Sequence, residues 1–332
     1  MCGRYVLELA MEHPQYLAGV EVDEPVINYN VAPTATVPIL VDRLLGPDEV
    51  LQDGATPQGA QGGLVTGDGT SSPVFTRELH SARWGLLPGW AKDPSYSSRA
   101  FNARSETIFE KPTFREAAVS GHCAIPVSGY YEWKTESTAA GKTVKTPYFV
   151  HRSDGRPIYF AGLYEWWKIP AEFAGPDGPF PGQGGNWLLS CSIITMDSPG
   201  NGEFDPGILA DLGEQVYAHP VERDLGQLHD RLPIPLQVSD DTSNNPADTL
   251  TSWLRSGCPA GSPKPGNDPA GRQLKGAYRA GAAASLENIR NQAFPQTHSW
   301  QLTPAHRDVG NVRNNGRYLI EAETDLLTGF KL

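Results

Sequence analysis

The sequence has no long apolar run, few cysteines and no excess of positive charge. No stretch of about 18 consecutive apolar residues occurs, which excludes a transmembrane helix. The N-terminus lacks the basic and apolar regions of a secretory signal peptide. Only four cysteines occur in 332 residues and none forms a C-x-x-C pair, so neither a disulfide framework nor a structural zinc site is expected. We therefore predict a cytoplasmic protein without a membrane segment, a metal or a cofactor.

The formal net charge of −11 argues against binding nucleic acid over the whole surface. The charge is uneven, because residues 77–115 hold seven basic residues against four acidic ones. Two interpretations remain open for this stripe: a solvated surface of mixed charge, or a local groove for an anionic ligand. The basic residues are Arg77, Arg83, Lys92, Arg99, Arg104, Lys111 and Arg115.

Glycine and proline are abundant, with 35 and 29 residues, which predicts many loops and few long helices. Short β-rich runs recur at 37–41, 122–133, 147–152, 157–167 and 187–196, separated by turn residues. Helical periodicity is found at 10–19, 105–118, 205–212, 221–229 and 245–255. We predict an α+β fold with a mostly antiparallel, barrel-like sheet core and flanking helices. One domain over 2–325 is expected, with flexible insertions at 46–73, 170–186 and 257–284.

The N-terminal sequence "MCGRYVL" places a cysteine directly after the initiator methionine. Aminopeptidases remove the methionine when the next side chain is small, which would leave an α-amine and a thiol on neighbouring carbons. In model peptides these groups titrate near ~8 and ~8.5, so each has a reactive fraction at neutral pH. Such a pair can condense with an aldehyde to a thiazolidine, or act as a nucleophile with its own base. A small residue placed here by chance is the alternative.

Three further stretches carry candidate polar groups. In "RAFNARSET" (99–107), Asn102, Arg104 and Glu106 alternate, so in an extended segment they share one face that suits an anionic ligand. In "VSGYYEWK" (127–134), Glu132 lies between aromatic residues, where a carboxyl group can serve as general acid or base. In "LHDRLPIPL" (228–236), His229 is a candidate proton carrier. The structural alternatives are a helix cap, a solvent-facing strand glutamate and an ordinary surface histidine.

The stretch "RWGLLPGW" (83–90) places Trp84 and Trp90 around a Gly-Pro turn within the basic stripe. Aromatic side chains next to basic residues suit the binding of unpaired bases. Tryptophans in a core are the more common outcome, and Trp84 is the better candidate for the core.

Taken together, these stretches resemble the SOS-response-associated peptidase family, which includes proteins that crosslink to abasic sites in single-stranded DNA. Eight motifs occur in the family's order from Cys2 to about residue 320. They are "MCGRY", "NYNVAPT" (28–34), "RWGLLPGW", "FNARSET", "GYYEW", "IITM" (193–196), "HDRLP" and "VGNVRNNG" (309–316).

The resemblance implies a role for each matching residue. Cys2 is the crosslinking nucleophile, Asn102 orients it, Glu132 assists proton transfer, and His229 opens the deoxyribose ring. The positions that the resemblance assigns to DNA binding are Arg4, Asn30, Pro33, Trp90 and Arg104. The implied partner is single-stranded DNA with abasic sites, bound by a monomer that associates with the nucleoid at damaged DNA. The family's other expected activities are an AP lyase and an autopeptidase that removes Met1.

Two other classes of protein remain open from the sequence. Class II glutamine amidotransferases also begin Met-Cys-Gly and use an N-terminal nucleophile, but they continue differently from "RYVL". A non-catalytic module that binds single-stranded DNA, with Cys2 incidental, is the third interpretation.

Overall fold

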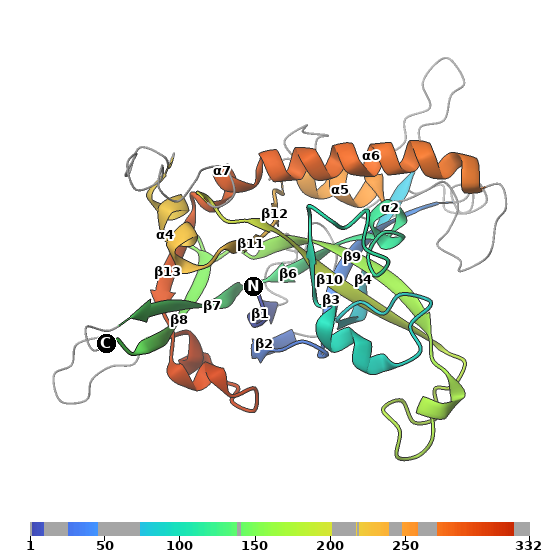
Figure 1. Ribbon diagram of the computed structural model, residues 1–332, viewed down its shortest axis with the longest axis horizontal. Coiled ribbons are helices and arrows are strands. Elements are labelled where there is room, and N and C mark those ends of the chain that lie inside the picture. The colour runs from blue at the N-terminus through green and yellow to red at the C-terminus, as the bar shows by residue number, and fades with distance from the viewer. Residues whose placement is uncertain are drawn as a thin grey trace, which may run out of the picture.

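The computed structural model describes residues 2–9, 26–45, 74–137, 141–200, 217, 219–238, 248–257 and 271–321. Two β-sheets form the centre of the molecule, and helices cover one side of it (Figure 1). The predicted helices at 10–19 and 205–212, the insertion at 46–73 and Cys258 lie outside the described residues.

The larger sheet closes into a barrel. Its strands pair in the order β10-β4-β3-β6-β9, and β9 pairs again with β10, which completes the ring. All but one of these pairings are antiparallel, since β4 runs parallel to β10. The strands are β3 (Thr36–Leu44), β4 (Phe75–Trp84), β6 (His122–Val127), β9 (Ile158–Lys168) and β10 (Trp187–Asp197).

Three short strands extend this sheet. β5 (Asn102–Arg104) runs parallel to β10, β11 (Arg231–Pro233) pairs with β10, and β12 (Pro235–Leu236) pairs with β9. The strand β10 therefore pairs with both segments near the candidate site: β5, which contains Asn102, and β11, which begins two residues after His229.

The second sheet is antiparallel and has the order β13-β8-β7-β1-β2. Only Ser128 separates β6 from β7, so the chain passes from the barrel to this sheet at that residue. Tyr130 links the two sheets, because its buried ring packs edge-on against Phe160 of the barrel and Trp300 of the second sheet. The strands are β1 (Tyr5–Leu9), β2 (Val26–Val31), β7 (Gly129–Ser137), β8 (Thr143–Arg152) and β13 (Trp300–Pro304).

The helix α6 lies across α5 and α2 (Figure 1). No helix in the described part of the chain is both long and apolar enough to cross a membrane. The α-helices are α2 (Ala117–Ser120), α4 (Pro220–Leu228), α5 (Thr249–Ser256), α6 (Gly271–Asn291) and α7 (Ala293–Thr297). Short 3₁₀ helices are η2 (Pro94–Arg99), η3 (Ala171–Phe173), η5 (Arg307–Gly310) and η6 (Arg317–Ile320).

The structure confirms the α+β class with its barrel-like antiparallel core, and the five predicted strand regions all contain strands. The predicted helices at 221–229 and 245–255 correspond to α4 and α5. The prediction of a helix over 105–118 is wrong for most of its length, because consecutive turns occupy 105–116 and only α2 follows. Pro112 lies in the middle of that stretch and has no N–H for a helical hydrogen bond.

Two of the expected insertions lie partly or wholly in described residues. Within 257–284, the chain is helical from residue 271 onward, and α6 was not predicted. Its glycines conceal a helical pattern whose buried members are Ala282, Leu286 and Ile289. Residues 170–186 form a folded excursion that buries Phe180 against Trp167. The flexibility of this excursion stays a prediction.

Candidate functional site

The site is centred on Cys2, which is fully buried just before β1. The side-chain N–H of Asn102 donates a hydrogen bond of 2.7 Å to the Cys2 carbonyl oxygen. β5 places Asn102 there, because it pairs with β10 and points Ala103 into the core, leaving Asn102 and Arg104 on the opposite face. The structure thus shows the predicted alternation for Asn102 and Arg104, but β5 ends at Arg104 and Glu106 lies in the turn that follows. The contact joins two residues that lie 100 positions apart.

Glu132 approaches the same region from β7. β1 and β7 pair at Tyr5 and Tyr130, and the Tyr131 N–H donates to the Arg4 carbonyl oxygen at 2.9 Å. The Glu132 side chain is only 5% exposed, so its carboxyl group is enclosed as the sequence predicted. Burial raises the pKa of the Cys2 thiol well above its usual value, and the charge of Glu132 adds to this effect. The thiol is therefore protonated at neutral pH.

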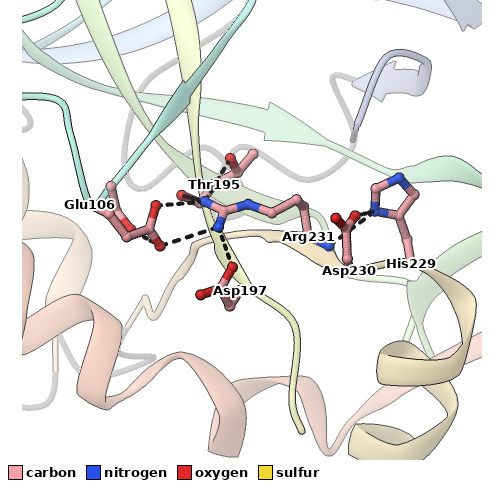
Figure 2. Close-up of polar contacts among 7 residues, drawn as sticks. Glu106, Thr195, Asp197, His229, Asp230 and Arg231 are labelled. Carbon is pink, nitrogen blue, oxygen red and sulfur yellow. Dashed lines mark hydrogen bonds and ion pairs between the residues drawn. The ribbon is translucent and has the colours of Figure 1, made fainter. Parts of the chain in front are cut away.

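His229 follows α4 directly and faces Glu132. Its Nε2 lies 3.9 Å from Glu132 Oε1. Its Nδ1 accepts a hydrogen bond from the Arg231 N–H at 3.0 Å and lies 2.6 Å from Asp230 Oδ1 (Figure 2). A neutral ring accepts from the N–H, whereas a protonated ring donates to the carboxylate. Nδ1 of His229 therefore has both a donor and an acceptor within hydrogen-bond distance.

A buried guanidinium connects the strands that carry these groups (Figure 2). The Arg231 side chain is 6% exposed and pairs with Glu106 Oε2 at 2.9 Å and with Asp197. It also donates to the Thr195 carbonyl oxygen at 2.8 Å. Burial acts to raise the pKa of Glu106, but hydrogen bonds, first of all that from Arg231, together with the charge of Arg231 lower that pKa below its usual value.

We call this group, Glu106, Thr195, Asp197 and Arg231, the Arg231 clamp. The clamp joins three segments: the turn after β5, the end of β10, and β11. It therefore holds the segment that carries Asn102 against the segment that follows His229. The sequence predicted Glu106 on the face of Asn102 and places Arg231 two residues after His229, but no spacing signal links either residue to Asp197.

Arg4 and Asn30 face a loop of the chain. Arg4 Nη1 donates to Asn30 Oδ1 at 2.7 Å and to the Val309 carbonyl oxygen at 2.8 Å. The Asn30 amide, 4% exposed, donates to the carbonyl oxygens of Asn311 and Asn314. These contacts attach the "VGNVRNNG" motif to β2 near Cys2. Contacts of Arg4 and Asn30 with DNA stay predictions.

Pro33 and Trp90 lie on two segments that Arg83 connects by hydrogen bonds. Pro33 begins the turn between β2 and β3, in which Thr34 has φ 75°. The half-buried Arg83 donates to the Thr34 carbonyl oxygen at 3.1 Å and to Ser97 Oγ of η2 at 3.0 Å. Trp90 precedes η2 and is 54% exposed, whereas Trp84 is fully buried, as expected.

The basic stripe divides into an inner and an outer part. Arg77 forms a buried ion pair with Asp42 at 2.7 Å, and Arg83 is taken up by the contacts just described. The remaining five side chains, those of Lys92, Arg99, Arg104, Lys111 and Arg115, are exposed. Within the described residues, no group of three or more His, Cys, Asp or Glu side chains could hold a metal ion.

The arrangement defines a class of site: a buried cysteine bonded to an amide and close to a carboxylate that faces an imidazole, beside exposed basic side chains. A family model described as SOS response associated peptidase (SRAP) matches residues 1–206. Because the match covers more than half of the sequence, the chain belongs to this family.

Curated relatives carry a common description. The chain is 36% identical to the abasic site processing protein YoqW of Bacillus subtilis over 151 residues, which are 44% of this chain and 59% of that protein. It is 25% identical to YedK of Escherichia coli over 328 residues, 97% of this chain and 99% of YedK. It is 29% identical to HMCES of Mus musculus over 170 residues, 39% and 44% of the two chains. Both proteins are likewise described as abasic site processing proteins.

The chain thus spans less than two thirds of YoqW, but nearly all of YedK. A solved structure of a protein from Bacteroides thetaiotaomicron has a TM-score of 0.52 with 18% sequence identity, covering 96% of this chain and 99% of that one. This likeness supports the fold.

Proposed function

We propose that this chain binds single-stranded DNA and links itself covalently to abasic sites through Cys2. The observation that carries the proposal is that Asn102 bonds to Cys2 and Glu132 acts electrostatically on its thiol, while His229 faces Glu132. These three residues come from separate parts of the chain. The description shared by YoqW, YedK and HMCES supports the choice of an abasic site as the substrate.

The chemistry begins with removal of Met1, which leaves a free amine on Cys2. His229 moves the proton that opens the sugar hemiacetal to its aldehyde. The amine attacks the aldehyde carbon, and loss of one water gives an imine, with Glu132 carrying protons between nitrogen and oxygen. The thiol sulfur then adds to the imine carbon while its proton passes to the nitrogen, which closes the thiazolidine ring.

The raised pKa of the Cys2 thiol supports this order of steps. A thiol that stays protonated is a weak nucleophile, so the amine reacts first and the sulfur follows once the imine carbon is electrophilic. Asn102 supplies a further group, because its buried Oδ1 has no hydrogen-bond partner among the described residues. That oxygen can accept from the Cys2 amine or from a hydroxyl of the opened sugar.

The exposed basic side chains supply the attraction to the phosphate backbone. Arg104 lies two residues from Asn102 on the same face of β5, next to the reacting centre. Binding should weaken as salt rises, because each phosphate contact releases counterions. A groove with local positive charge reconciles DNA binding with the overall charge of −11.

The related activities are part of the proposal. The protein acts as a cytoplasmic monomer that associates with the nucleoid at damaged DNA, and lyase and autopeptidase activities belong to the same site. Autoprocessing would cleave the peptide bond ahead of Cys2 and so expose its amine.

The test is a denaturing gel with a single-stranded oligonucleotide that contains one abasic site. The wild type should give a stable protein–DNA band and Cys2→Ser none, while Cys258→Ser controls for the loss of one thiol. A band that survives Cys2→Ser would refute the covalent role of Cys2. Release of ammonia from glutamine would favour the amidotransferase class, and DNA binding without any linkage would favour a non-catalytic module.

A further inference from the structure

A buried carboxylate lies on α4, the helix that leads into His229. Glu222 is in the first turn of this helix and is only 5% exposed. It belongs to the buried face of α4, whose other members, Leu225 and Leu228, are apolar. A carboxylate on such a face costs free energy unless a polar group pairs with it. The position of Glu222 therefore requires a specific partner.

A partner of Glu222 is His298, which directly follows α7. Its Nε2 lies 2.7 Å from Glu222 Oε1, a distance at which the ring donates a hydrogen bond to the carboxylate. The His298 ring also stacks on that of His219, with 4.4 Å between the ring centres and 16° between the planes. His219 is the N-cap of α4, and its Nδ1 accepts the Val221 N–H at 3.3 Å. Two contacts therefore join the start of α4 to the end of α7.

The other end of α4 is also closely packed. Gly226 passes so near to the chain after β10 that an added Cβ would lie 2.3 Å from the Pro199 carbonyl oxygen. The helix packs against β7, the strand that carries Glu132. His229 is the C-cap of the helix, and its N–H donates to the Leu225 carbonyl oxygen at 3.2 Å. The place of α4 on β7 therefore sets the place of the His229 backbone.

The helix connects Glu222 rigidly to His229. His229 follows Glu222 by seven positions, which is two turns of an α-helix and about 10 Å along its axis. Positions at this spacing lie on one face of a helix, so a shift or rotation of α4 at Glu222 also moves His229. Apolar contacts tolerate such sliding, whereas the hydrogen bond from His298 restricts both distance and direction. Through α4, this bond opposes any change in the 3.9 Å between His229 Nε2 and Glu132 Oε1.

We infer that Glu222 and His298 are positioning residues for His229. Their hydrogen bond holds α4 at the height and rotation that place the His229 ring beside Glu132, where the ring can move the proton that opens the sugar. Both residues act through the helix and not by contact with DNA. The inference rests on the proposed function and adds to it the contact that keeps the proton carrier in place.

The experiment measures the single-turnover rate of crosslinking between the full chain and an oligonucleotide with one abasic site. Glu222→Ala should lower this rate by about 10-fold to about 100-fold, up to the lower end of what loss of general acid–base catalysis costs. In a His229→Ala background the same substitution should change the rate less than about 2-fold, because the side chain that Glu222 positions is already absent. A general loss of structure would instead lower the rate in both backgrounds.

Further variants test the hydrogen bond itself. Glu222→Gln keeps an acceptor and His298→Gln keeps a donor, so each should retain most of the wild-type rate. His298→Ala should lower the rate as Glu222→Ala does, and it supplies the test at a 35% exposed side chain if Glu222→Ala does not fold. Asp224→Ala is the matched control and should leave the rate within about 2-fold. It removes a carboxylate from the same helix, where Asp224 is 46% exposed and pairs with the adjacent Arg223.

The possible failures are distinguishable. An oligonucleotide with a tetrahydrofuran in place of the abasic sugar has no aldehyde, and Glu222→Ala should bind it as tightly as the wild type does. Weaker binding of this analogue, an unchanged crosslinking rate, or an equal loss of rate with and without His229 would overturn the positioning role alone. No crosslinking by the wild type would overturn the positioning role together with the proposed function.

Discussion

Replacing Arg231 by methionine removes the centre of the clamp while keeping most of its volume. The guanidinium is 6% exposed, but its partners Glu106 and Asp197 are 33% and 45% exposed, so water can reach both carboxylates after the substitution. Breaking a fully buried pair costs about 3–5 kcal/mol. Because these carboxylates are partly solvated, we expect about 2 kcal/mol of lost stability.

The assay is urea unfolding of the wild type, Arg231→Met, Glu106→Gln and the double variant. Removing either partner breaks the same contact, so the double variant should lose about 1 kcal/mol less than the sum of the two single losses. The crosslinking rate of Arg231→Met should fall, because the side chain of residue 231 anchors β11, whose backbone N–H at residue 231 donates to His229 Nδ1. Strict additivity, or a loss for Arg231→Met below about 0.5 kcal/mol, would refute the clamp.

Further predictions concern single residues. Glu132→Gln should slow crosslinking at least about 100-fold in single-turnover assays, as expected for loss of general acid–base catalysis; an unchanged rate would contradict its role. His229→Ala should slow reaction with the ring-closed sugar more than with a simple open aldehyde, and equal effects on the two substrates would argue against ring opening. Burial raises the pKa of Glu165 from 4.5 to about 7. Between these two pH values the folded protein keeps a proton that the unfolded chain has released, so the free energy of unfolding falls as the pH rises. Glu165→Gln keeps an acceptor for the Gly89 N–H and should therefore gain about 2 kcal/mol over the wild type between pH 5 and pH 8; a gain independent of pH would contradict this. In urea unfolding, Gly85→Ala should cost several times the ~1 kcal/mol expected for Gly141→Ala. Both glycines have positive φ, but of the two only Gly85 would place a Cβ 2.2 Å from a backbone atom, Ser97 O. Equal costs would exclude that clash.

Much of the fold could be predicted from the sequence because strands alternate and helices have caps. The regions of β3, β6 to β10, α4 and α5 all follow from local patterns. Two helix predictions failed. Pro112 interrupts an otherwise helical pattern at 105–118, and the glycine content of 271–284 conceals α6. The closure of the barrel by β9 and β10 depends on tertiary pairing, which no local pattern encodes.

The sequence likewise predicted some contacts of the candidate site and not others. The contact between Asn102 and Cys2 agrees with the pairing that the motifs implied, and the enclosure of Glu132 follows from its aromatic neighbours. The attachment of Arg4 and Asn30 to the loop at 309–316, and the link from Arg231 to Asp197, could not be predicted, because they join residues far apart in sequence that have no shared pattern.

The central claim is tested most directly by the intact mass of the purified protein before and after incubation with single-stranded DNA that contains an abasic site. The account predicts a chain without Met1 that gains the mass of the oligonucleotide less one water, with the addition mapped to Cys2. An adduct on a chain that retains Met1, or no adduct on a chain that has lost it, would contradict the account.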